Sequence, residues 1–180
     1  MAEYDIQNLE ILIVDDDANM CRLIRNILNS LGVKSIKTAG AASLGLSILE
    51  DFHADIAICD LVMEPLTGID FTRMVRTNEG SPNCYLPIIM LTGHAERSAV
   101  ETARDAGVNE FLTKPVSAEK LYSKIHTLIE TPRVFVRSSD YFGPDRRRKK
   151  VFFVFERRDT KKKEEVIDTH AADRQMSQGE

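Results

Sequence analysis

The sequence DIAICD at residues 55–60 places four apolar residues between two aspartates. An apolar run of this length, with no polar alternation, is typical of a strand that is buried on both faces. Such strands belong to parallel sheets, because helices cover both faces of those sheets. Asp60 ends the run, and parallel sheets of this kind bind ligands beyond the carboxyl ends of their strands.

Similar apolar runs occur on both sides of this stretch and alternate with amphipathic segments. Strands are predicted at residues 9–14, 33–39, 55–60, 87–92 and 108–113. Apolar residues at helical spacing predict helices within residues 20–31, 41–51, 69–75, 99–106 and 117–130. The alternation predicts an α/β fold with a five-stranded parallel sheet, doubly wound by helices through right-handed crossovers.

The composition is that of a globular protein and argues against disulfide-rich, zinc-binding and membrane-spanning classes. The chain has 180 residues, of which 43% are hydrophobic, so it is long enough to bury a core without disulfides or metals. Its three cysteines (Cys21, Cys59 and Cys84) are too widely spaced for a disulfide framework or a zinc site. We expect no membrane span, because every apolar stretch is shorter than the roughly 20 residues that a span needs. No secretory leader is recognised, and a reducing, cytoplasmic location follows.

The charges divide the chain into two parts. Residues 1–130 contain 11 Lys and Arg against 19 Asp and Glu, a net charge of −8. Residues 131–180 contain 13 against 9, a net charge of +4. We therefore expect an acidic domain at residues 8–130, followed by a basic, aromatic and partly disordered extension at residues 131–180.

Polar side chains stand at the carboxyl ends of four predicted strands. They are the aspartates at 15–17, Asp60, Thr92 and Lys114. Taken singly they have structural explanations, since the aspartates at 15–17 suit a helix N-terminus and Asp60 suits a cap before a turn. Together they favour phosphoryl transfer: clustered carboxylates repel unless a cation such as Mg²⁺ is present, and a lysine can neutralise the transferred group. Asp60 is the best candidate for the nucleophile.

These motifs resemble the receiver domain of two-component response regulators, in a chemotaxis-regulator-like form and over residues 8–130. The matching residues are Val14-Asp15-Asp16-Asp17, Asp60 with Met63 and Gly68, Leu91-Thr92-Gly93, Phe111 and Lys114-Pro115. The resemblance implies a flavodoxin-like fold. The chain departs from the family at Met63-Glu64-Pro65, where the proline is displaced by one position, and at Phe111, where tyrosine is more frequent.

The resemblance also implies a mechanism. Asp16 would bind Mg²⁺ directly, Asp15 mainly through water, and Asp60 and the backbone carbonyl of Val62 would complete the protein ligands. Asp60 would accept a phosphoryl group from a sensor histidine kinase or phosphotransfer protein, and Lys114 would pair with it. Thr92 and Phe111 would act as the switch that changes the surface offered to a downstream protein. We expect no enzymatic activity beyond the domain's own Mg²⁺-dependent phosphorylation and dephosphorylation.

The extension carries weaker signals. Residues 134–136 and 151–155 are β-prone, Gly143-Pro144 predicts a turn between them, and the polar sequence from residue 156 onward predicts disorder. The basic run is Arg146, Arg147, Arg148, Lys149 and Lys150. It fits either docking on the chain's own acidic domain or binding to nucleic acid, anionic lipid or an acidic protein. Two functions stay open: a phosphorylated module that signals by protein–protein contact, which we favour, and a DNA- or RNA-binding regulator. A phosphohydrolase is disfavoured, because no source of a second metal or a general acid is evident.

Overall fold

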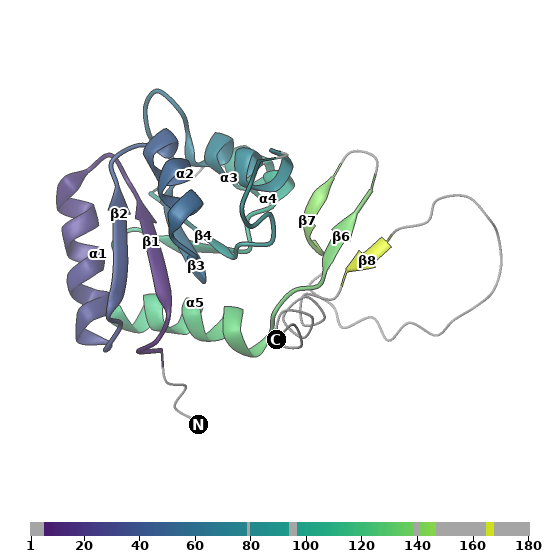
Figure 1. The fold of residues 1–180 in the computed structure, drawn as a ribbon. Coiled ribbons are helices and arrows are strands. Elements are labelled where there is room, and N and C mark those ends of the chain that lie inside the picture. Colours follow the sequence, from purple (N-terminus) through teal and green to yellow (C-terminus); the bar gives the residue numbers. More distant parts are fainter. Residues whose placement is uncertain (1–5, 79, 94–96, 139–140, 147–164, 168–180) are drawn as a thin grey trace, which may run out of the picture.

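The structure is a computed structural model that describes residues 6–78, 80–93, 97–138, 141–146 and 165–167. Strands and helices alternate in the order β1 (Glu10–Val14), α1 (Ala18–Ser30), β2 (Ser35–Ala39), α2 (Ala42–Asp51), β3 (Ile56–Asp60), α3 (Gly68–Thr77), β4 (Ile88–Thr92), α4 (Arg97–Ala106), β5 (Glu110–Thr113) and α5 (Ala118–Glu130). The five strands form one parallel sheet in the order β2-β1-β3-β4-β5 (Figure 1). The predicted fold class is confirmed.

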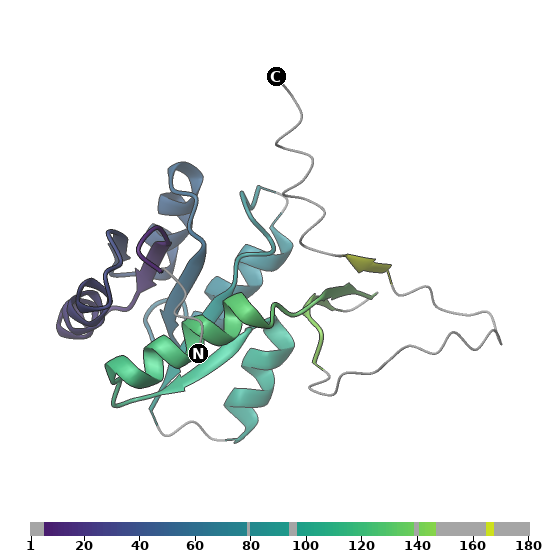
Figure 2. The same ribbon diagram turned by 90° about the horizontal axis from the view of Figure 1, so that it is seen from below.

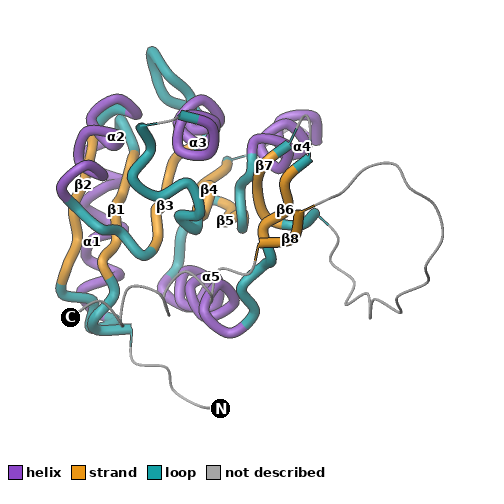
Figure 3. Tube along the Cα trace, turned by 45° about the vertical axis from the view of Figure 1, so that its right-hand side comes forward, coloured by secondary structure: helices purple, strands orange, loops and turns teal. Residues whose placement is uncertain are grey.

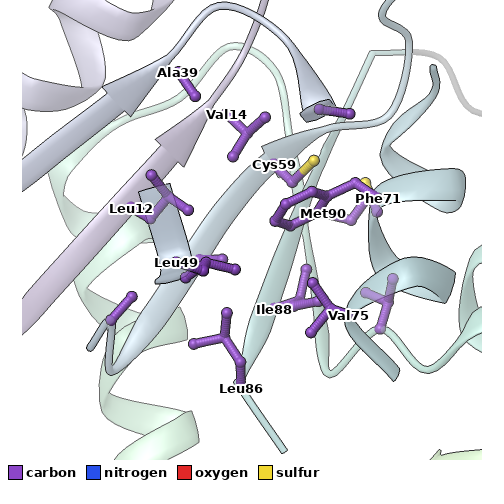
Figure 4. Packing of buried hydrophobic residues seen from close by; sticks show 14 of the residues in the cluster. Leu12, Val14, Ala39, Leu49, Cys59, Phe71, Val75, Leu86, Ile88 and Met90 are labelled. Carbon is purple, nitrogen blue, oxygen red and sulfur yellow. The ribbon is translucent and has the colours of Figure 1, made fainter. Parts of the chain in front are cut away.

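The sheet is buried from both sides, as the continuous apolar runs indicated. Every residue of β3 and β4 is buried. Side chains on one face pack against α2, α3 and α4, and Figure 4 shows Cys59 and Met90 of this face beside Phe71 of α3, and Ile88 beside Val75. Side chains on the other face pack against α1 and α5. Two separate cores thus hold the strands in register.

The register brings together the ends of strands that are distant in sequence. Asp60 pairs with Leu91 across β3 and β4, and Thr92 pairs with Thr113 across β4 and β5. The strand order reverses between β1 and β3, since β2 lies on the outer side of β1. Open α/β sheets bind ligands at this kind of topological switch point.

Helix starts follow capping residues more closely than they follow the apolar stripes. Asp17 accepts a hydrogen bond from the backbone of Asn19 and caps α1, which begins two residues before the predicted segment. Thr67 and Asp70 form a reciprocal capping box at the start of α3. Ser117 caps α5, as its position before the last amphipathic segment predicted.

The extension adds a second, small sheet. Its strands are β6 (Phe135–Arg137), β7 (Phe142–Pro144) and β8 (Glu165–Ile167), paired antiparallel in the order β7-β6-β8. Figure 2 shows this sheet beginning where α5 ends. The predicted turn at Gly143-Pro144 is wrong, because both residues lie in β7, which pairs antiparallel with β6. The predicted strand at residues 151–155 lies outside the described residues.

The first part of the extension packs directly on the α/β domain. Phe135 is only 3% exposed, and its ring meets the rings of Tyr85 and Phe142 at centroid distances of 5.2 and 5.7 Å. Beneath it lies the buried guanidinium of Arg76, 5.1 Å from the Phe135 centroid. Burial lowers the pKa of Arg76 to about 10, so the side chain is still charged at neutral pH. The first residues of the extension therefore form an ordered contact with the α/β domain.

Arg76 ties this contact to the sheet. Its guanidinium donates hydrogen bonds to the carbonyl oxygens of Cys84, Leu86 and Gly107, and to the side-chain oxygen of Asn109. Asn109 in turn accepts a hydrogen bond from the backbone of Ile88, the first residue of β4. One buried cation thus connects α3, the entries to β4 and β5, and the extension.

No helix within the described part of the chain has the length and apolar character required to cross a membrane.

Phe135→Ala is expected to lower the free energy of unfolding by about 3 kcal/mol, because it empties a closed aromatic contact and uncovers a buried cation. Urea unfolding followed by circular dichroism measures this change. The matched control is Val134→Ala, since Val134 is adjacent in sequence but 43% exposed, and it should cost less than about 0.5 kcal/mol. Equal effects of the two substitutions would contradict the packing described here.

Candidate functional site

The carboxyl edge of the main sheet gathers the polar residues that the sequence singled out. Asp15 and Asp16 directly follow β1, Asp60 ends β3, Thr92 ends β4, and Lys114 directly follows β5. Each side chain therefore projects from the end of a strand that both cores hold in place. The backbone amide of Lys114 donates to the carbonyl oxygen of Thr92 at 2.7 Å, which fixes the last two strand ends to each other.

Three carboxylates are crowded at this edge. Carboxylate oxygens of Asp15, Asp16 and Asp60 all lie within 4.8 Å of one another. Asp15 and Asp60 are buried, whereas Asp16 is exposed. Carboxylates at such distances repel one another, so the cluster requires positive charge close by.

Backbone groups hold the buried carboxylate of Asp15 in place. Its Oδ1 accepts a hydrogen bond from the amide of Asp17 at 2.9 Å, and its carbonyl oxygen lies 3.3 Å from the thiol of Cys21. Sequence reasoning missed this contact of Cys21 with the backbone of Asp15, because nothing in the residues next to Cys21 indicates a partner six positions earlier. The exposed carboxylate of Asp16 is approached by a different group, the amide of Glu64, which lies 3.4 Å from Asp16 Oδ2.

Lys114 supplies the positive charge that the described residues place against the cluster. Its Nζ lies 2.8 Å from Asp60 Oδ1 and 3.7 Å from Asp15 Oδ2. Partial burial opposes the charged form of Lys114, but the hydrogen bond and charge of Asp60, helped by Asp15, outweigh it and raise its pKa. Lys114 therefore stays protonated throughout the physiological range.

Lys114 alone neither balances the charge of the three carboxylates nor gives every buried polar atom of the site a hydrogen-bond partner. Among the described residues, the buried side-chain atoms without a hydrogen-bond partner are Asp15 Oδ2 and Thr92 Oγ1. Burial raises the pKa of Asp15, and the nearby charges of Asp60 and Asp16 raise it further, against the opposing effects of the Asp17 amide and Lys114. A buried carboxylate oxygen with no hydrogen-bond donor, among hard oxygen ligands, fits a bound Mg²⁺.

A glycine allows the end of β3 to meet the next helix closely. A Cβ atom on Gly68 would collide with the carbonyl oxygen of Asp60 and would lie 2.8 Å from Met90 Sδ. The amide of Gly68 donates to the carbonyl oxygen of Leu61 at 3.2 Å. The first residue of α3 thus packs against the backbone of Asp60, which explains in physical terms why glycine stands eight residues after Asp60.

The remaining predicted residues lie in different places. Asp17 is the N-cap of α1, so the capping interpretation holds for this aspartate. Phe111 lies on β5, paired with Met90 and packed against the core. The side chain of Val62 is 73% exposed, and the role of its carbonyl as a metal ligand stays a prediction.

Arg146, the described residue of the basic run, is not at this edge. Arg146 lies near the end of α4, where its guanidinium is 3.1 Å from the carboxylate of Asp105 and stacks on the ring of Tyr141. Arg147, Arg148, Lys149 and Lys150 lie outside the described residues.

Asp15→Asn is expected to stabilise the metal-free protein at pH 7, raising Tm by about 4 °C, which corresponds to about 1 kcal/mol. The reason is the raised pKa of Asp15: folding disfavours its charged form, and the amide removes that charge while it can still accept from Asp17. As pH falls through the raised pKa, wild-type Asp15 becomes protonated, so the advantage of the variant should shrink towards about pH 4.

Thermal unfolding in a chelator at both pH values measures this difference. Asp17→Asn is the matched control, because asparagine caps helices as well as aspartate does and Asp17 is exposed. A variant that is less stable than the wild type at pH 7 would show that the Asp15 charge stabilises the fold.

Comparison with known proteins agrees with this geometry. The family model of the response regulator receiver domain matches residues 11–126. The chemotaxis protein CheY of Pseudomonas aeruginosa is 37% identical over 122 residues, which cover 68% of this chain and 97% of that protein. CheY-3 of Vibrio cholerae is 33% identical over 124 residues, covering 69% of this chain and 94% of the relative.

Solved structures give the same result. The receiver domain of a sensor histidine kinase from Pseudomonas aeruginosa, solved with a magnesium ion coordinated in its active-site cleft, is 27% identical, with a TM-score of 0.61. The match covers 69% of this chain and 99% of that domain. The chemotaxis protein CheY4 of Vibrio cholerae is 25% identical, with a TM-score of 0.61 over 66% of this chain and 96% of its own. The chain therefore belongs to the response regulator receiver domain family.

Proposed function

We propose that Asp60 accepts a phosphoryl group from a phosphohistidine of a sensor histidine kinase or phosphotransfer protein, and that the phosphorylated domain signals by contact with a downstream protein. One observation carries this proposal: the buried Asp60 carboxylate is 2.8 Å from Lys114 and within 4.8 Å of two further carboxylates. Membership of the receiver family supports a role in two-component phosphorelay signalling.

The residues of the chain divide the chemistry among them. A carboxylate oxygen of Asp60 attacks the phosphorus, the new O–P bond forms, and the N–P bond breaks with its electron pair remaining on the donor imidazole. Lys114, already in contact with Asp60, pairs with an oxygen of the transferred group. Thr92 Oγ1, buried without a partner, is free to donate a hydrogen bond to another oxygen. Movement of Thr92 gives space to the ring of Phe111, which lies on the neighbouring strand.

Asp15, Asp16 and Asp60 would hold Mg²⁺, together with the backbone carbonyl of Val62. Bound there, the metal supplies positive charge that offsets the charge on the transferring oxygens. The donor set supports this assignment, since it consists of carboxylates and one buried oxygen among them, Asp15 Oδ2, has no hydrogen-bond donor. The magnesium ion in the related receiver domain supports it independently.

We assign no catalytic activity to the domain other than its own phosphorylation and the loss of that phosphoryl group. We also place the domain in the cytoplasm, which suits its free cysteine thiols, two of them buried, and its similarity to chemotaxis proteins. The protein-contact function is preferred to nucleic-acid binding, since residues 1–130 carry a net charge of −8, which repels a polyanion. Arg146 of the basic run is also paired with Asp105.

In the presence of Mg²⁺ and acetyl phosphate, the wild-type chain should gain one phosphoryl group, and Asp60→Asn should gain none, because an amide is not a nucleophile for this transfer. Intact-mass spectrometry counts the groups that are added. Asp17→Asn is the matched control, because it removes an exposed aspartate from the same edge and should label like the wild type. Undiminished labelling of Asp60→Asn would place the acceptor elsewhere.

A further inference from the structure

The extension is attached by a buried ion pair to the strand that carries Lys114 at its end. Arg133 lies 2.9 Å from Glu110, and Lys124 of α5 lies 2.8 Å from the other oxygen of the same carboxylate. The Glu110 side chain is only 7% exposed, so this ion pair is shielded from solvent much more than a surface pair. Glu110 is the first residue of β5.

The extension also holds the turn that leads into β5. We use the name extension hairpin for residues 133–146, which include β6 and β7. A Cβ on Gly143 of the hairpin would lie 2.9 Å from Gly107, whose φ of +103° shapes the turn between α4 and β5. Arg146 pairs with Asp105 at the end of α4, and Figure 3 shows β6 and β7 beside that helix. The hairpin therefore contacts both the entry to β5 and its first residue.

The position of β5 makes these contacts relevant to the acceptor site. The strand has four residues, so Glu110 and Lys114 are about 13 Å apart along one extended segment. β5 lies at the edge of the main sheet and pairs with β4 alone. An edge strand has fewer hydrogen-bonded neighbours to fix it, so the contacts of Glu110 with α5 and the hairpin account for more of its position.

Phosphorylation must change the far end of this strand. Lys114 now contacts Asp60 directly, and a phosphoryl group on Asp60 has to enter between them. The backbone amide of Lys114 donates to the carbonyl oxygen of Thr92, so a backbone shift at Lys114 reaches the ends of both β4 and β5. The docked hairpin is part of the phosphoryl-free arrangement and opposes any shift of β5 away from it.

We infer that the extension hairpin is an autoinhibitory contact: its docking through Glu110 and α4 stabilises the phosphoryl-free receiver, and phosphorylation in turn loosens the hairpin. The inference rests on the proposed function, because it requires Asp60 to be the acceptor. Coupling of this kind is reciprocal, so each event weakens the other by the same factor.

The test compares wild type with Arg133→Gln/Arg146→Gln, which removes the two hairpin charges that pair with Glu110 and Asp105 and leaves Phe135 in place. Beryllium fluoride with Mg²⁺, a mimic of the phosphoryl group, is titrated against each protein by NMR. The double variant should bind it about three- to tenfold more tightly. Arg137→Gln is the matched control, since Arg137 stacks on Phe142 within the hairpin, and its affinity should equal that of wild type.

A second measurement needs no substitution: beryllium fluoride should increase amide hydrogen exchange of residues 133–146 in the wild-type chain. Equal affinities together with unchanged exchange would overturn the coupling and leave the acceptor assignment intact. Weaker binding by the double variant would overturn the autoinhibitory sign. Wild-type protein that binds no beryllium fluoride would instead overturn the proposed function, and the inference with it.

Discussion

Repulsion among Asp15, Asp16 and Asp60 opposes folding, so the rest of the structure has to offset its cost. Carboxylate oxygens of these residues lie within 4.8 Å of one another, and burial of Asp15, with the charges of Asp60 and Asp16 added, raises its pKa despite Lys114. Holding the carboxylates together therefore costs free energy. Two apolar cores, one on each face of the sheet, supply the stability that keeps these groups together. The same crowding makes the site receptive to a cation and to the chemistry that follows from one.

Much of this arrangement was predictable because its causes are local. A strand buried on both faces has a continuous apolar sequence, and parallel strands place their carboxyl ends at one edge, so residues as distant as Asp60 and Lys114 could be assigned to one site. Helix boundaries were less accurate, because the apolar stripe of α1 begins at Met20 whereas its cap is Asp17. The contacts that orient Asp15, such as the thiol of Cys21, leave no sequence signal.

The extension was harder to predict, because long-range packing decides its structure. Gly143-Pro144 has the local signature of a turn, yet it forms a strand beside β6. Arg76 falls in an amphipathic helix, where an arginine normally faces solvent, but here it lies beneath Phe135 and satisfies four backbone and side-chain oxygens. Nothing in the order of residues connects Arg76 with an aromatic ring almost sixty positions later. Local sequence preferences therefore gave the wrong structure for these residues, because tertiary contacts outweigh such preferences here.

The close contact between Gly68 and the carbonyl of Asp60 bears on how such a chain diverges during evolution. Both ends of the loop from Leu61 to Thr67 are fixed by the backbone, one by β3 and the other by the first turn of α3. Between them, the side chains of Val62 and Glu64 are exposed beside the acceptor. Substitutions of these two exposed residues change the surface of the loop and leave Asp60 in position, so the surroundings of the site can diversify while its geometry is retained.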